Sequence, residues 1–233
     1  VVGLDSEIYT DSERNTTLAF VTLSESGERS FSFFRKNTAD YALDISMVKP
    51  SLEKADIVHI GSLMLSEKRG RMFAEEVAAL VKGAGKLLSF DVNFREDIFE
   101  SKDAAKAVYA PWLERADILK LSEEESEMFF GKDGELPLLK LSSGKKIFVT
   151  LGKKGAKLYE NGTMRECGTI DVRVVDTNGA GDAFYAGVLR QIDGGEKDGG
   201  RILRYANVCG ALTTAKYGAT ESLPCGGEVV KYL

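Results

Sequence analysis

The sequence predicts an α/β protein with a mostly parallel central sheet and a small β appendage near its N-terminal end. Two observations carry this prediction. Strand-like and helix-like segments alternate from about residue 55 onward, whereas the first 40 residues contain only strand-like patterns. Such alternation is typical of parallel sheets that are covered by helices on both faces. We therefore divide the 233 residues into an appendage over residues 1–40 and an α/β domain over residues 41–233.

The appendage is predicted to be a β-hairpin. Residues 16–23 and 30–35 are rich in aromatic and β-branched side chains, and Glu25, Ser26 and Gly27 supply a turn between them. The apolar runs "LAFV" and "FSFF" would be exposed in such a hairpin, and an uncovered apolar edge favours association. We therefore expect the hairpin to pair two copies of the chain in a homodimer.

The α/β domain is read in chain order from its apolar patterns. The predicted strands lie in the segments 55–65, 86–94, 117–122 and 145–152, and a small hairpin or meander follows over 155–170. The predicted helices lie over 66–85 and 101–116, begin at 123, and continue with 180–191 and 199–218. No repeat, low-complexity tract or proline-rich linker divides these segments.

Composition excludes several classes of function. The net charge is −5 and no basic stripe is present, which argues against a nucleic-acid partner. No apolar run approaches the length of a membrane span and no signal-peptide pattern opens the chain. The three cysteines are far apart and are expected to be reduced thiols in a cytoplasmic protein, and the only histidine, His59, is expected to lie in the core or at a strand end.

Polar residues follow several predicted strands. Asp91, Asn93 and Arg95 follow one strand, residues 122–125 follow the next, and residues 150–155 follow the third. Ligands of parallel α/β sheets bind beyond the carboxyl ends of the strands. These residues together therefore predict a binding site at that edge, although turn-forming residues are common at any single strand end.

The segment "VVDTNGAGDAFYAGVL", residues 174–189, carries the strongest chemical signal. Gly179 and Gly181 have no side chains that would block a ligand, and their amides lie where a helix begins. A helix N-terminus binds anions through unpaired N–H groups and the helix dipole. Asp182, in the first turn, fits a general base that deprotonates a hydroxyl while the amides hold a phosphoryl group. A helix cap is the simpler role for this acid, but a cap does not require the glycines before it.

This segment resembles the C-terminal signature of the ribokinase-like (PfkB-type) carbohydrate kinases. Four further segments match the family in order and spacing: "DVNFR" at 91–95, "KLSEEE" at 120–125 with Ser122 in place of an asparagine, "TLGKKG" at 150–155, and "NVCGALTTAKYGA" at 207–219. The resemblance implies a three-layer ribokinase-like sandwich with a β lid. It also implies ATP-dependent phosphorylation of a sugar hydroxyl, and the hairpin region resembles fructokinase-like members most.

The resemblance also implies a role for each matching residue. Asp182 would be the base, and the amides of Gly179, Ala180 and Gly181 would form the anion hole. Arg35, Asn93 and Arg95 would contact the sugar or the transferred phosphate. On the nucleotide side the matching residues are Lys120, Thr150, Gly152, Gly155, Asn207 and Gly210. Glu125 would act indirectly on Mg²⁺, and Asp176 and Asn178 would hold a monovalent cation such as K⁺, near Gly218.

The start of the chain departs from the family pattern. Family members begin with a strand that carries a substrate-binding aspartate and then a Gly-Gly segment, and the sequence shows neither, so a truncated or incomplete chain is expected. Three alternatives to a fructokinase stay open. Arg35 and Arg95 would equally suit the carboxylate of 2-keto-3-deoxygluconate, a nucleoside kinase would share the fold, and a fragment could bind sugar or nucleotide without catalysis. A dinucleotide-binding dehydrogenase is rejected, because "GAGDAF" lacks the GxGxxG spacing and lies late in the chain.

Overall fold

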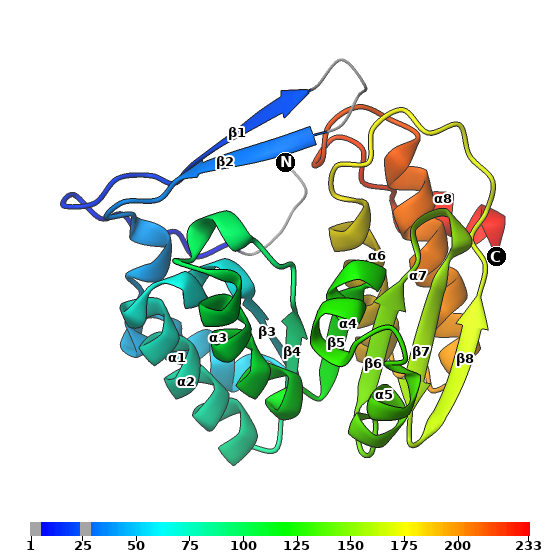
Figure 1. Ribbon diagram of the computed structural model, residues 1–233, viewed down its shortest axis with the longest axis horizontal. Helices are drawn as coiled ribbons and strands as arrows, with labels where there is room; N and C mark the ends of the chain where they lie inside the picture. The colour runs from blue at the N-terminus through cyan, green and yellow to red at the C-terminus, as the bar shows by residue number, and fades with distance from the viewer. Residues whose placement is uncertain (1–5, 24–28) are drawn as a thin grey trace.

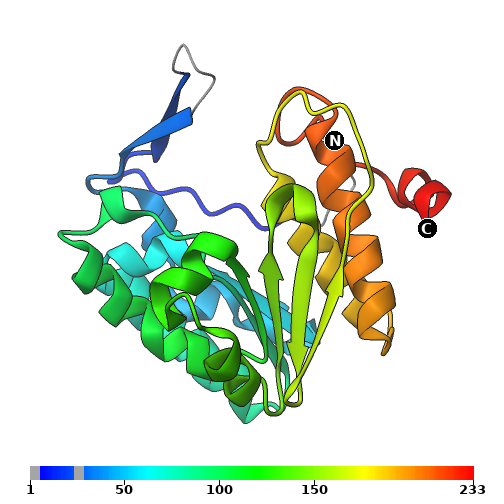
Figure 2. The ribbon, with the colours of Figure 1, turned by 45° about the vertical axis from the view of Figure 1, so that its right-hand side comes forward.

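The computed structural model describes residues 6–23 and 29–233, so the predicted turn at Glu25, Ser26 and Gly27 lies outside the described residues. Figure 1 shows a central sheet with helices on both faces and a separate two-stranded sheet above its upper edge, and the three layers separate clearly in Figure 2. The predicted α/β class and the three-layer arrangement are confirmed.

The central sheet has six strands in the order β3-β4-β5-β6-β7-β8. The strands are β3 (Ile57–Gly61), β4 (Leu87–Asp91), β5 (Ile118–Ser122), β6 (Lys146–Thr150), β7 (Ala156–Glu160) and β8 (Thr163–Cys167). The first four run parallel, and β7 and β8 extend the sheet in antiparallel fashion. The mostly parallel sheet is therefore confirmed, and the hairpin predicted over residues 155–170 is its outer edge. The carboxyl ends of the four parallel strands meet at one edge.

Helices cover the two faces unequally. One face carries α2 (Lys68–Gly83), α3 (Lys102–Arg115), α4 (Glu123–Phe130) and α5 (Glu135–Leu141), with α1 (Ile45–Lys54) packed beside α2. The other face carries α6 (Ala180–Asp193) and α7 (Gly199–Thr214), and α8 (Gly226–Val229) follows near the C-terminal end. Short 3-10 segments lie at Ala39–Tyr41, Ser62–Ser66, Glu96–Ile98, Gly152–Lys154 and Val230–Tyr232. None of the described helices combines the length and the apolar composition that crossing a membrane requires.

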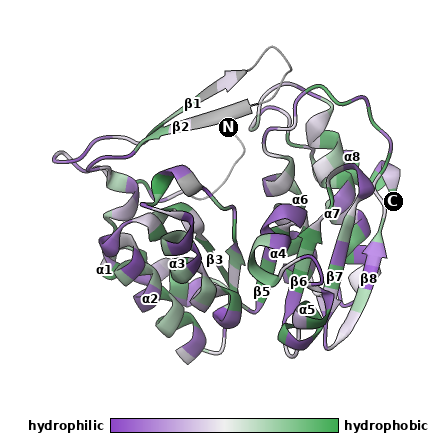
Figure 3. Cartoon of the chain, in the orientation of Figure 1, coloured by the Kyte–Doolittle hydropathy of each residue, from purple (hydrophilic) through white to green (hydrophobic). Residues whose placement is uncertain are grey.

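Two apolar cores hold the layers together. On the first face the Phe90 and Trp112 rings stack with their centroids 5.6 Å apart. On the second face Phe148 and Phe184 meet edge to face at 6.3 Å. Figure 3 shows hydrophobic colour on the central strands β5 and β6, whereas the outermost strand β8 is largely polar. At about 25 cal/mol per Å² of buried apolar surface, these two cores supply most of the stabilisation.

Helices α6 and α7 approach each other closely because glycines lie at their contact. A Cβ atom on Gly187 would be 3.0 Å from the Cys209 sulfur, and one on Gly210 would be 3.2 Å from the Ala180 carbonyl oxygen. Larger side chains at these positions would push the helices apart. The glycines thus fix the N-terminus of α6 beside the C-terminal part of α7, at the carboxyl edge of the sheet.

The two-stranded sheet confirms the predicted hairpin with slightly shifted bounds. Strands β1 (Leu18–Leu23) and β2 (Arg29–Phe34) pair in antiparallel fashion and do not join the central sheet. Figure 1 shows them above the carboxyl edge of that sheet. Leu18, Phe20 and Phe34 lie on one face of the hairpin and are 51%, 54% and 62% exposed.

Candidate active site

The site is built around the N-terminus of α6. Gly179, just before the helix, has a φ of 73°, in the left-handed region that glycine tolerates best. Its carbonyl oxygen accepts the hydrogen bond from the Ala183 amide at 2.8 Å that begins the helix. Asp182 lies in the first turn with its side chain exposed. An exposed carboxylate beside amides at a helix start is the arrangement that the sequence predicts.

A cavity of about 620 Å³ opens beside this helix start. Five residues predicted for the nucleotide side line it: Thr150, Gly152, Gly155, Asn207 and Gly210. Ala180 and Gly181, from the predicted anion hole, line its inner end. The structure therefore brings the predicted loop after β6, helix α7 and the start of α6 into one cavity.

Backbone geometry shapes the walls of this cavity. Gly155 has a φ of 103°, and a Cβ atom there would lie 2.1 Å from the Cys167 carbonyl oxygen. The Asn207 side-chain amide donates to the Cys167 and Gly168 carbonyl oxygens at 2.8 and 3.2 Å. Asn207 is 6% exposed, so its visible role is to tie the end of β8 to α7. Its predicted contact with a nucleotide stays a prediction.

Lys120 lies directly below the start of α6 and does not line the cavity. Its ammonium group donates to both Asp91 carboxylate oxygens, at 2.9 and 2.8 Å, and both side chains are almost fully buried. A Cβ atom on Gly181 would be 3.3 Å from the Lys120 nitrogen. Burial raises the pKa of Asp91, while the charge and hydrogen bonds of Lys120 oppose that rise. A contact between Lys120 and a nucleotide stays a prediction.

Glu125 connects two strand ends. Its carboxylate accepts hydrogen bonds from the Phe94 and Ser122 amides, both at 2.7 Å, and Ser122 in turn caps α4 through its hydroxyl. Burial raises the pKa of Glu125, and the two amides act in the opposite direction. This capping box explains why serine replaces the family asparagine without loss of the turn. In the described part of the chain no three His, Cys, Asp or Glu side chains are grouped to hold a metal ion.

Asp176 joins the loop that precedes the N-terminus of α6 to the loop that follows α7. Its carboxylate accepts hydrogen bonds from the Asn178 amide at 2.7 Å and from the Gly218 amide at 3.2 Å. The side chain is 8% exposed. The three residues that the sequence groups for a monovalent cation therefore lie together, which fits the prediction without testing it.

The predicted sugar-side residues lie across from the cavity, after β4 and at the base of the hairpin. Asn93 has a φ of 34°, and its backbone N–H donates a hydrogen bond to the Asp91 carboxylate at 3.2 Å. Arg35 is 9% exposed and donates to the Leu63 carbonyl oxygen at 2.7 Å and to Asp40. Burial raises the pKa of Tyr109 to about 12, and the positive charges of Arg95 and Arg35 act in the opposite direction. Arg35 is thus a buried anchor of the hairpin, and its sugar contact stays a prediction.

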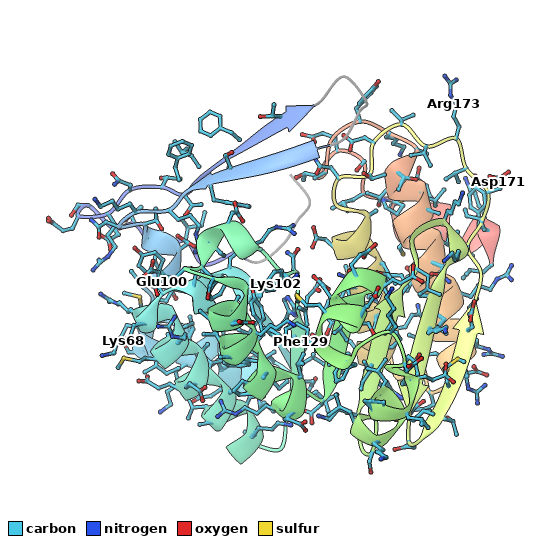
Figure 4. All side chains as sticks on the ribbon, viewed as in Figure 1. Lys68, Glu100, Lys102, Phe129, Asp171 and Arg173 are labelled. Atoms are coloured by element: carbon cyan, nitrogen blue, oxygen red, sulfur yellow. The ribbon has the colours of Figure 1, made fainter. Side chains whose placement is uncertain are left out.

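The sequence missed part of the site. The loop between β8 and α6 forms one wall of the cavity through Thr169, Ile170, Asp171, Val172 and Val174. The length of this loop before the glycine segment could have indicated a role in binding, because long loops are often functional. Asp171 and Arg173 belong to this loop, and Figure 4 shows both at the edge of the molecule. His59 lies in the middle of β3 with an exposed side chain, so its expected place in the core or at a strand end is wrong.

The geometry defines a class of protein: an α/β protein with a cavity at the carboxyl edge of its sheet, glycines at a helix start, and an acidic side chain beside them. The model of the pfkB family of carbohydrate kinases matches residues 2–225. The chain therefore belongs to the pfkB family, and the predicted enzyme class, a carbohydrate kinase, is confirmed.

Relatives and solved structures agree with this assignment. Fructokinase-1 of Zea mays is 36% identical over 240 residues, which cover 98% of this chain and 74% of the relative. Fructokinase-2 of Solanum lycopersicum is 35% identical over 243 residues, which cover 99% and 74%. The structure of a fructokinase with bound ATP from Xylella fastidiosa superposes with a TM-score of 0.86 at 29% identity, covering 95% of this chain and 74% of that one. The ribokinase-like fold is thus confirmed.

Proposed function

We propose that this protein transfers the terminal phosphoryl group of ATP to a hydroxyl of fructose. One observation carries the proposal: Gly181 lines the 620 Å³ cavity, and the exposed Asp182 follows as the next residue. A nucleotide in the cavity would place its phosphates at the start of α6. A sugar on the other side of Asp182, near Asn93 and Arg95, would present a hydroxyl to the base. Fructokinases among the similar proteins support the choice of sugar.

In this mechanism the chain positions two substrates and moves one proton. Asp182 takes the proton from the attacking hydroxyl. The amides of Gly179, Ala180 and Gly181 hold the negative charge on the transferred phosphoryl group, which is the main contribution of a protein to this reaction. Arg95 and Arg35 lie on the sugar side and would orient the sugar or the transferred phosphate.

The cavity fits ATP because glycines leave room for it. Gly152, Gly155, Gly181 and Gly210 line the cavity, and none of them places a side chain in it. Mg²⁺, when bound with the nucleotide, would neutralise phosphate charge, and Glu125 would act on it indirectly. A ribokinase-type protein of E. coli with ATP and Mg²⁺ supports this cofactor, at a TM-score of 0.81 and 28% identity.

Asp176, Asn178 and Gly218 would hold K⁺ beside the N-terminus of α6. Their hydrogen-bonded arrangement around the Asp176 carboxylate supports this assignment. A fructokinase structure from Vibrio cholerae contains fructose, ADP and potassium, at a TM-score of 0.86 and 31% identity. Turnover measured in K⁺ and in tetramethylammonium buffers tests the assignment, and equal rates in both buffers would reject it.

Substrate preference is the direct test of the proposed function. We expect ADP formation with fructose to exceed that with ribose, nucleosides and 2-keto-3-deoxygluconate in kcat/KM, as measured by a coupled assay with Mg²⁺ and ATP. The hairpin and the "DVNFR" segment are the reason for this order. A tenfold preference for 2-keto-3-deoxygluconate would move the protein to that alternative, because two arginines near the sugar side also suit a carboxylate.

A binding fragment without catalysis is the second candidate. It would bind ATP or ADP by calorimetry and would form no ADP with any sugar of the panel. Asp182 and the glycines before it argue for catalysis, because a pure binder has no use for a base at the phosphate end of the cavity.

We also propose that the hairpin pairs two copies of the chain. The apolar face of Leu18, Phe20 and Phe34 is exposed, and the Phe20 and Phe34 rings meet at 5.4 Å. A lone two-stranded sheet is marginally stable in water, so a partner surface would stabilise it. Sedimentation of the protein with Phe20→Lys should show a monomer where the unmodified protein sediments as a dimer. A monomeric unmodified protein would contradict the proposal.

A further inference from the structure

The buried pair of Asp91 and Lys120 has a place that the motifs alone do not explain. The two residues are direct neighbours in the register of β4 and β5, and both side chains point to the α6 face of the sheet. Asp91 is 6% exposed and Lys120 is 6% exposed. Removing two charges from water is unfavourable, and apolar residues often replace such pairs without loss of stability. A purely structural role therefore gives little reason for this pair.

The position of the lysine relative to the cavity supplies a reason. The Lys120 ammonium lies 3.3 Å from where a Gly181 Cβ atom would be, and Gly181 lines the inner end of the cavity. The absent side chain of Gly181 leaves the positive charge next to the amides that face a ligand. Positive charge at that point would add to the positive end of the α6 dipole.

We infer that Asp91 is a positioning residue, whose carboxylate holds the Lys120 ammonium aimed beneath Gly181 toward the terminal phosphate of a bound nucleotide. The inference rests on the proposed function and adds a residue that acts through another. Both Asp91 oxygens contact the ammonium, so the carboxylate fixes the direction of the lysine side chain.

The other charged groups around the pair have no hydrogen bond to the lysine. The titratable groups that act on the pair come from three other elements: His59 on β3, Glu125 on α4 and Asp182 on α6. Among the described residues, only the carboxylate of Asp91 has a hydrogen bond to Lys120. Asp91 is therefore the group that sets the direction of the lysine side chain.

The experiment is a double-mutant cycle in the complete chain, with Asp91→Asn, Lys120→Gln and the double variant. Two quantities are measured: kcat with fructose, and the ratio of the dissociation constants of ADP and ATP by calorimetry. We expect Asp91→Asn to lower kcat at least about tenfold, because the Lys120 nitrogen loses the two carboxylate contacts that direct it toward the phosphate. The preference for ATP over ADP should fall in the same way.

The double variant decides whether Asp91 acts through Lys120. We expect Asp91→Asn to cause no further loss of kcat or of ATP preference once Lys120→Gln is present, because coupled residues are not additive. If Asp91→Asn alone fails to fold, the double variant can still be compared with Lys120→Gln, because the double variant leaves no unpaired buried charge. Glu160→Gln is the matched control: it breaks the Lys146–Glu160 pair at the amino-terminal edge of the sheet and should leave both quantities unchanged.

Two results would overturn the inference. One is a normal kcat and a normal ratio of the ADP and ATP dissociation constants in folded Asp91→Asn. The other is an equal further loss when Asp91→Asn is added to Lys120→Gln, which would give Asp91 an independent role. Failure of the proposed function is a separate outcome, because the unmodified protein would then form no ADP with any sugar, while the binding ratio would still test the positioning of Lys120.

Discussion

Asp182→Asn should lower kcat by roughly 10² to 10⁴, the usual contribution of a general base. Asparagine keeps the shape of the side chain and most of its ability to cap α6, but it cannot accept the proton of the attacking hydroxyl. Nucleotide affinity should change little, because a carboxylate repels phosphates and does not hold them. Steady-state kinetics with fructose and calorimetry with ADP measure the two effects.

Asp193→Asn is the matched control for this variant. Asp193 is the last residue of α6, so the same chemical change is made at the far end of the same helix. Its kcat should equal that of the unmodified protein. If Asp182 only caps the helix, Asp182→Asn will lose about 1 kcal/mol of stability and keep its turnover. Near-normal kcat in the folded variant would end the proposed mechanism.

The fold could be predicted from the sequence because its patterns are local. The four parallel strands alternate with helices whose apolar periodicity is plain, and residues at strand ends must meet at one edge of the sheet. The loop after β6 could therefore be placed at this edge in advance, and the family resemblance added Asn207 and Gly210 of α7, which line the same cavity. The glycines at 179 and 181 indicated the helix start, because few other roles need two small residues directly before an acid.

The parts that were missed depend on contacts between distant residues. Three described helices, α1, α5 and α8, were not predicted: α1 contains Pro50, which is unfavourable inside a helix, and α5 and α8 have only seven and four residues. The partner of Lys120 could not be read from the chain either. Asp91 lies 29 residues away, and only the register of β4 and β5 places the two side chains opposite each other. Burial of Arg35 likewise follows from the 3-10 segment Ser62–Ser66, which its guanidinium contacts.

The wall of the cavity opposite α6 rests on one glycine, and Gly155→Ala should disrupt it. Alanine at a φ of 103° is strained, and its Cβ atom would lie 2.1 Å from the Cys167 carbonyl oxygen, so the backbone of one loop must move. We expect a loss of at least about 2 kcal/mol in the free energy of unfolding, or about 4 °C or more in Tm. Because the displaced loop lines the cavity, ADP affinity should fall at least about tenfold, which corresponds to about 1.4 kcal/mol.

Gly162→Ala separates backbone strain from the clash. Gly162 has a φ of 73° in the turn between β7 and β8, and a Cβ atom there would meet no atom within 4 Å. It should therefore show only the conformational cost of about 1 kcal/mol and normal ADP affinity. Thermal unfolding and ADP calorimetry on both variants make the comparison. Equal ADP affinity in the two would mean that the loop at Gly155 does not hold the nucleotide, and the ATP site would have to lie elsewhere along the carboxyl edge of the sheet.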